Sequence, residues 1–147
     1  MPDQSSTPKL GVLMYVASRS LEARAYDAVV AAGATDLTPT QARLIAQIDP
    51  DGTRVVTLAA RARTTKQSAT SIVDQLERAG YVERVPDPAD GRAKLVRLTD
   101  HAREVGVAAQ VEVDRALGEW EAHLGADRMR DLEDTMRRLR EITDPWA

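Results

Sequence analysis

The chain has 147 residues, a length typical of one domain, and its net charge of −3 gives it no general affinity for nucleic acid. It contains no cysteine, which excludes disulfides, thiolate metal ligands and a thiol redox centre. Hydrophobic residues make up 43% of the chain but Phe is absent, so we expect a core of aliphatic side chains packed between helices.

No apolar run approaches the ~20 residues that a membrane span requires. Residues 1–9 are polar and lack the apolar stretch of a signal peptide, so we expect them to form a frayed tail. These features predict a cytoplasmic protein with no membrane partner.

The first predicted element is a long helix over residues 9–32. Its apolar residues recur every three or four positions from Leu10 to Ala32, and Gly33 is suited to end it. Such a helix is roughly 36 Å long. It cannot cover its own apolar face, so it needs a partner.

Three shorter helices are predicted next. Thr38-Pro39-Thr40-Gln41 combines a capping box with a proline suited to the first helical position, and this helix stops before Asp49-Pro50. The next helix runs over Val55–Arg61. The third begins at the capping residue Thr65 and ends at Gly80. The last two helices and the turn between them predict a helix-turn-helix.

Two short alternating segments, Tyr81–Val85 and Leu95–Leu98, predict a β-hairpin directly behind the helix-turn-helix. We expect Arg92 and Lys94 at its tip. This arrangement is typical of a winged DNA-binding module, in which one helix enters the major groove and the hairpin reaches the neighbouring backbone or minor groove. Residues 51–100 carry nine Lys and Arg against seven Asp and Glu, a local basic excess in an acidic chain.

Two further apolar helices are predicted after the hairpin. Thr99 caps the first, which ends at Gly125, and Met129 to Ile142 line one face of the second. Together with the first helix they flank the winged module. The simplest way to bury all three apolar faces is between two chains of a symmetric dimer, and the alternative is a monomeric helical bundle.

The sequence therefore predicts a mainly α fold with a small β-hairpin wing. We expect an N-terminal dimerisation helix in residues 1–36, a winged helix-turn-helix DNA-binding region in residues 37–99, and C-terminal dimerisation helices in residues 100–147.

The motifs Leu58-Ala59, Ser68–Val82 and Asp87-Pro88-Ala89-Asp90-Gly91-Arg92, followed by Val96-Arg97-Leu98-Thr99, resemble those of the MarR family of bacterial transcriptional regulators. The resemblance implies a triangular homodimer with intertwined terminal helices. Such proteins usually repress a nearby gene and release DNA when a small, often phenolic, ligand binds. The resemblance also implies that Asp90 pairs with a nearby Arg and stiffens the wing. Two positions depart from the family pattern: Ser71 stands where Arg or Asn is common, and Ala102 where Gly is usual.

The candidate DNA-binding residues lie at the start of the recognition helix and on the wing. Short polar side chains allow close approach to base edges; Gln67 suits adenine, and Lys66 suits guanine or a phosphate. Arg92 suits a narrow minor groove or a phosphate. The alternative is that both surfaces are only solvated. The full set is Thr65, Lys66, Gln67, Ser68, Thr70, Ser71, Arg92 and Lys94, with Arg61, Arg63 and Arg97 as further phosphate candidates.

Tyr15, Arg19 and Trp120 are candidate effector-binding residues, because an aromatic ring beside an Arg can hold a planar anion. The alternative is that the two aromatics pack in the dimer interface and Arg19 is solvated. His101 and His123 lie about 33 Å apart on one predicted helix, too far apart to share a metal within a chain.

We find no phosphate-binding loop and no nucleophile-and-base spacing, so we expect no cofactor and no enzymatic activity. The expected partners are double-stranded DNA, a second copy of the chain and a small aromatic or phenolic effector. The alternative function is a winged-helix protein-interaction module without DNA binding, which would not need Arg92 and Lys94.

Overall fold

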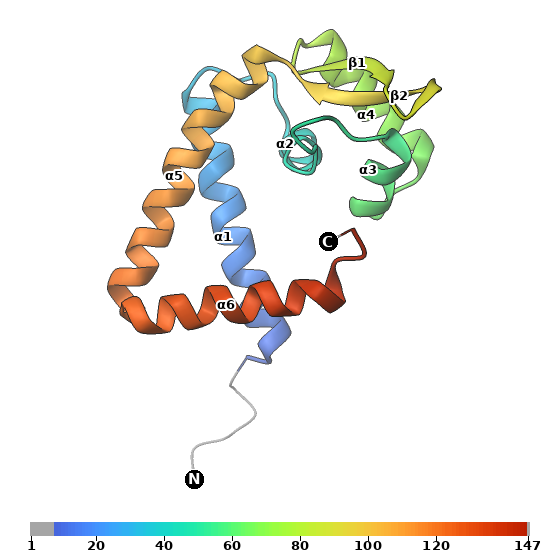
Figure 1. The fold of residues 1–147 in the computed structure, drawn as a ribbon. Helices are drawn as coiled ribbons and strands as arrows, with labels where there is room; N and C mark the ends of the chain where they lie inside the picture. Colours follow the sequence, from blue (N-terminus) through green and yellow to red (C-terminus); the bar gives the residue numbers. More distant parts are fainter. Residues whose placement is uncertain (1–7, 147) are drawn as a thin grey trace.

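The computed structural model describes residues 8–146, so the expected tail at residues 1–9 falls almost entirely outside the described residues. Two long helices, α1 (Leu10–Ala31) and α5 (Asp100–Leu124), lie side by side (Figure 1). At their centre the Arg24 guanidinium bridges Glu112 and Glu119, with a shortest N–O distance of 2.6 Å to each. This bridge fixes the register of α1 against α5.

α6 (Ala126–Thr143) begins after Gly125, whose φ of 89° allows the sharp turn out of α5. It leaves α5 at a steep angle and runs back toward the short helices, where the chain ends (Figure 1). Within the described residues, none of the helices is long and apolar enough to cross a membrane.

The remaining elements form a winged helix-turn-helix: α2 (Pro39–Ile45), α3 (Val55–Arg61), α4 (Lys66–Arg78), β1 (Val82–Asp87) and β2 (Asp90–Leu98). We call residues 37–99 the winged module. Its core contains Leu58, Val73 and Leu76, each 0% exposed, from the facing sides of α3 and α4. The mainly α fold with a hairpin wing expected from the sequence is confirmed.

Local capping signals place the helix starts where the sequence predicts them. Thr38 and Gln41 form the capping box of α2. Thr65 accepts a hydrogen bond from the Ser68 backbone at the start of α4, and Thr99 accepts one from Ala102 at the start of α5. These contacts satisfy backbone donors that a helix leaves unpaired at its first turn.

The hairpin differs from the predicted one in length. β1 continues to Asp87 and β2 starts at Asp90, so only Pro88 and Ala89 form the turn. Pro86 is tolerated in β1, opposite Lys94, because each strand of a two-stranded ribbon is an edge strand and one face of it needs no donor. Thr53 adds an isolated bridge to Val96 on the other side of β2.

Apolar side chains remain exposed on α1 and α6 of the single chain. On α1 the exposed group occupies almost consecutive positions rather than one stripe: Leu10, Val12, Leu13, Met14, Tyr15 and Val16. On α6 the exposed apolar residues are Leu132, Met136 and Ile142. These apolar side chains are left uncovered in the single chain.

Candidate nucleic-acid interface

α4 presents one buried and one polar face. Ala69, Val73 and Leu76 are each 0% exposed and anchor the helix to the core. The opposite face begins directly after the N-cap residue Thr65 and includes Lys66, Gln67 and Ser71, which are exposed. One face of α4 is therefore packed against the core and the other is open to solvent, as insertion of a helix into a DNA groove requires.

The hydroxyl groups on this face are not equally available. Thr65 Oγ1 donates to Ser68 Oγ at 2.9 Å, and Thr70 Oγ1 donates to the Lys66 carbonyl oxygen at 2.7 Å. Both hydroxyl groups therefore donate hydrogen bonds within the first turns of α4. Lys66, Gln67 and Ser71 make no side-chain hydrogen bond to the described part of the chain, so their polar groups are open to a ligand.

The wing carries its two cations on strand β2 close to the turn, whereas the sequence analysis placed them within a longer turn. Asp87 pairs with Asp90 and Pro86 with Lys94, so Gly91, Arg92 and Ala93 form a bulge without partners on β1. Arg92 and Lys94 are both exposed and have no ion-pair partner among residues 8–146. The sequence missed this because it overestimated the length of the turn.

The wing is supported mainly by Asp87, a residue that the sequence reading overlooked. Arg54, the residue before α3, donates from Nε to Asp87 Oδ2 at 2.7 Å, whereas Asp90 lies 4.0 Å from the same guanidinium. The Ala89 backbone N–H and Arg54 hold the pKa of Asp87 below its usual value. Asp90 instead accepts from the Arg92 backbone N–H at 3.1 Å. The primary wing-supporting pair is therefore Arg54–Asp87.

Some arginines of the winged module form ion pairs within it, and other cations of the module do not. Arg84 binds both Asp74 (2.6 Å) and Glu77 (2.7 Å), which ties α4 to β1. Arg97 binds Glu83 across the hairpin, so its charge is neutralised. The cations of the module that lack an ion-pair partner within residues 8–146 include Arg63, Lys66, Arg92 and Lys94.

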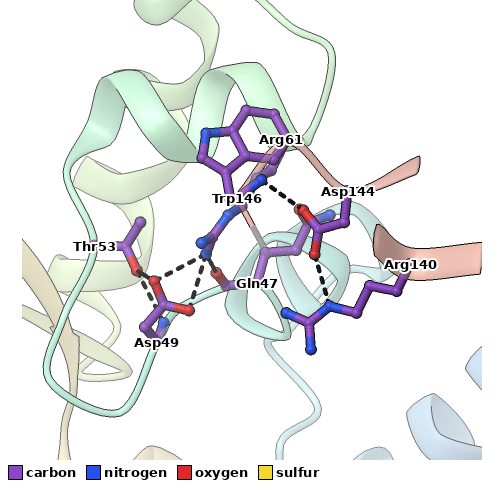
Figure 2. Close-up of polar contacts among 7 residues, drawn as sticks. All are labelled: Gln47, Asp49, Thr53, Arg61, Arg140, Asp144 and Trp146. Carbon is purple, nitrogen blue, oxygen red and sulfur yellow. Dashed lines mark hydrogen bonds and ion pairs between the residues drawn. The ribbon is translucent and has the colours of Figure 1, made fainter. Parts of the chain in front are cut away.

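Arg61, a phosphate candidate from the sequence, is engaged inside the protein. Its NH1 donates to the Gln47 carbonyl oxygen at 2.7 Å and contacts Asp49 at 3.1 Å, and the side chain is only 18% exposed (Figure 2). Arg63 lies in the turn between α3 and α4 with a left-handed φ of 50° and is exposed. Of these two, only Arg63 is free to reach DNA.

A cavity of about 770 Å³ separates the winged module from α1 and α5. Its wall contains the apolar side chains of Val29, Leu37, Ile45 and Val105 and the rings of Tyr26 and Tyr81. The Tyr81 hydroxyl donates to Asp36 Oδ1 at 2.6 Å, and burial together with Asp36 raises the pKa of Tyr81 to about 12.

Of the three candidate effector residues, only Arg19 lines this cavity. Tyr15 and Trp120 are absent from its wall, because Tyr15 is 65% exposed on the outer part of α1 and Trp120 lies far along α5. Arg43 and Arg103 join Arg19 at the wall instead. They come from α2 and α5, so no sequence spacing pointed to them.

The histidines do not form a metal site. His101 packs against the Tyr81 ring, with the ring centroids 5.2 Å apart. No group of three or more His, Cys, Asp or Glu side chains suited to a metal is present in the described range.

The fold is a winged helix-turn-helix with an exposed polar helix face and exposed cations on the wing. Residues 35–93 match the family model described as MarR family. Over these residues the chain is similar to the MarR family of transcriptional regulators.

Curated relatives are also transcriptional regulators. Over 95 residues the chain is 34% identical to the transcriptional activatory protein BadR of Rhodopseudomonas palustris, covering 64% of this chain and 53% of BadR. It is 29% identical to the regulator FarR of Neisseria gonorrhoeae over 145 residues, which covers 98% of this chain and 97% of FarR. The chain spans about half the length of the first curated relatives that it matches.

Solved structures share the whole fold. NadR in complex with 4-hydroxyphenylacetate superposes with a TM-score of 0.71 at 26% identity, covering 97% of this chain and 99% of NadR. CouR from Rhodococcus jostii RHA1, bound to p-coumaroyl-CoA, gives 0.69 at 23% identity over 100% and 99% of the two chains. An E. coli MarR variant complexed with operator DNA gives 0.62 at 24% identity over 88% and 92%.

Proposed function

We propose that this regulator is a homodimeric repressor that binds a pseudo-palindromic operator and releases it when a small aromatic or phenolic ligand binds. The observation that carries the DNA-binding part is the open polar face of α4 together with Lys66, Arg92 and Lys94, cations without an ion-pair partner among residues 8–146. The operator complex of E. coli MarR, which has the same fold, supports the same use of this surface.

The homodimer is supported by the exposed apolar residues of α1 and α6. Leu10 is 71% exposed and Ile142 is 84% exposed, although both sit in well-formed helices. In this proposal residues 1–36 and 100–147 form the dimer interface, and residues 37–99 bind DNA. Two copies of the winged module then contact two half-sites about one helical turn apart.

Within the winged module we assign two kinds of DNA contact. Gln67 and Ser71 read base edges in the major groove, with Thr65, Ser68 and Thr70 shaping the helix start. Lys66, Arg92 and Lys94 neutralise phosphates, and Arg92 also fits a narrow minor groove.

The effector site in this proposal is the cavity between the winged module and the long helices. Its apolar wall fits an aromatic ring, and Arg19, Arg43 and Arg103 can attract an anionic group. Glu22 pairs with Arg19 at 2.6 Å and with Arg43 at 3.4 Å, so a ligand carboxylate competes with Glu22. NadR with 4-hydroxyphenylacetate and CouR with p-coumaroyl-CoA support a ligand of this class.

A salt titration tests the DNA contacts. The operator is first recovered by sequencing genomic fragments bound by the purified protein, and a random duplex serves as reference. Arg92→Ala should weaken binding to both duplexes and lower the slope of log K against log salt by about one for each phosphate that is no longer neutralised. Gln67→Ala should cost roughly 1–3 kcal/mol on the operator and much less on random DNA.

Arg78→Ala is the matched control, because it removes the same charge from an exposed position at the opposite end of α4 from Lys66 and Gln67. It should leave both affinities unchanged. If wild-type protein binds neither duplex, the protein-interaction alternative replaces this proposal. Equal losses on both duplexes for Gln67→Ala would remove that residue from base recognition.

A second experiment tests the effector. 4-Hydroxyphenylacetate and related aromatic carboxylates should raise the melting temperature of the free protein and weaken operator binding. We expect partial release, since inverting a 99:1 equilibrium needs a preference of about 5.5 kcal/mol for one state. Ala109→Leu, which narrows the cavity, should abolish both effects. A panel that changes neither melting temperature nor DNA affinity would rule out this ligand class.

A further inference from the structure

The last three described residues, Asp144, Pro145 and Trp146, lie against the winged module (Figure 2). We call them the C-terminal segment. The guanidinium carbon of Arg61, on α3, lies 5.8 Å from the ring centroid of Trp146. At this distance a cation over an indole face is attracted by the ring. The end of the chain therefore meets a helix of the DNA-binding unit, far from α5, to which α6 is joined.

The receiving side is held in place by its own contacts. Arg61 NH1 is bound by the Gln47 carbonyl oxygen at 2.7 Å and by both carboxylate oxygens of Asp49 at 3.1 Å. Asp49 in turn accepts from Thr53 Oγ1 at 3.1 Å, and its backbone N–H donates to the same hydroxyl at 2.8 Å. The guanidinium is thus fixed over the link between α2 and α3.

The C-terminal segment is itself shaped to reach Arg61. Asp144 Oδ1 accepts from the Trp146 backbone N–H at 3.0 Å, and Oδ2 accepts from Arg140 Nε at 2.9 Å. These contacts fold the chain back at Pro145, immediately after α6 ends. The Trp146 backbone N–H and Arg140 hold the pKa of Asp144 below its usual value, so this arrangement persists at neutral pH.

We propose that the C-terminal segment is a latch that fastens the end of α6 to α3 and sets the orientation of the winged module relative to the long helices. α5, α6 and the winged module then form a closed ring, as their arrangement in Figure 1 shows. On its other side the module is attached to the long helices through α2 and β2, which contact α1 and α5.

The consequence for DNA rests on the homodimer proposed above. If α6 lies in the dimer interface, the latch connects that interface to α3 and so fixes the separation of the two α4 helices. Operator half-sites have a fixed spacing, so this separation determines which operators fit. The latch itself is a contact within one chain and does not depend on the dimer.

The first experiment tests the contact alone. The chain contains two tryptophans, so Trp120→Phe leaves Trp146 as the single tryptophan fluorophore. In that background Arg61→Ala should increase acrylamide quenching of Trp146 and lower its anisotropy, and Arg61→Lys should give an intermediate value. Arg78→Ala, at an exposed position on α4, is the matched charge control and should change neither. Unchanged quenching in Arg61→Ala overturns the latch.

The second experiment tests the orientation. The chain has no cysteine, so Arg78→Cys, exposed at the end of α4, carries a single spin label for each chain. Electron–electron distance measurements on the full protein should give a narrow inter-label distribution. Trp146→Ala and a chain ending at Thr143 should broaden it, and Trp146→Phe should restore part of the narrow distribution. Because the Trp146 side chain is half exposed, these variants should keep the wild-type circular dichroism spectrum.

The outcomes are distinguishable. If the labelled Arg78→Cys protein with Trp146 in place gives no inter-label signal, the homodimer is contradicted, and the quenching experiment still decides the latch. A clear inter-label distance with the same width in Trp146→Ala contradicts the orienting role of the latch and leaves the homodimer standing.

Discussion

At the scale of single residues, the wing depends on which of two nearby carboxylates meets Arg54. Asp87 is 6% exposed and also accepts the Ala89 backbone N–H at 2.9 Å, so it closes the turn and binds the guanidinium at once. Asp90 is exposed and contacts Arg54 only at 4.0 Å. Asp87 is therefore the residue whose loss should loosen the wing.

Asp87→Asn should lower the stability of the winged module in a pH-dependent way. The folded-state pKa of Asp87 lies below the unfolded value of about 3.9. The stabilisation is therefore present above that value and is lost as pH falls through the lower folded-state pKa. Thermal melts from pH 7 to 3 should show the gap between wild type and Asp87→Asn closing at the acid end. Asp90→Asn is the control and should have the smaller effect at pH 7. A difference in melting temperature between wild type and Asp87→Asn that stays constant from pH 7 to 3 would contradict the role of the Asp87 carboxylate.

At the scale of elements, α4 is held by its buried side and by Arg84, which links it to β1. Leu76 is 0% exposed in the core between α4 and the hairpin. Ser71, on the same helix, is exposed and makes no side-chain hydrogen bond to the described residues. The buried face of α4 therefore contributes to stability, and its exposed face is the one that we assign to DNA recognition.

Leu76→Ala should destabilise the protein by about 2–5 kcal/mol, because it removes buried methyl groups and leaves a cavity. Ser71→Ala should change stability by less than about 0.5 kcal/mol. Urea denaturation measures both values. If Ser71→Ala costs as much as Leu76→Ala, the polar face of α4 is structural and its assignment to DNA would be wrong.

Element boundaries that depend on local signals were predictable from the sequence, and those that depend on pairing were not. Thr38, Thr65 and Thr99 each cap a helix through contacts three residues away, which a sequence displays directly. The hairpin turn was overestimated because Pro86 and the bulge at residues 91–93 look like loop positions until the strand register is known. The role of Asp87 follows from that register and was missed, whereas the contact of Asp90 with an Arg was expected and is present only at 4.0 Å.

At the scale of the whole molecule, contacts between distant segments were beyond sequence reasoning. The cavity takes Arg19, Arg43 and Arg103 from three helices, and neither Tyr15 nor Trp120 reaches its wall. The contact of Trp146 with Arg61 joins positions with no shared periodicity. The sequence indicated only that the apolar terminal helices need a partner. The exposed apolar side chains of α1 and α6 are consistent with that need.

The dimer proposal predicts different effects for two exposed apolar residues. Leu13, 50% exposed on α1, lies in the proposed interface, and Val56, 54% exposed on α3, lies outside it. Leu13→Glu should produce monomer or aggregate, because a charge cannot be buried without a partner. Val56→Glu should remain a dimer. Light scattering at micromolar concentration checks both, and a monomeric wild-type protein would contradict the dimer.

The bridge from Arg24 to Glu112 and Glu119 also sets an order of events during synthesis. Glu112 and Glu119 follow Arg24 by 88 and 95 residues, and the entire winged module lies between Arg24 and these two residues in the chain. At translation rates of ~5–20 residues per second, α1 waits about 5–20 s on the ribosome before α5 emerges. The winged module, whose contacts are nearer in sequence, has time to fold before α1 and α5 can pack together.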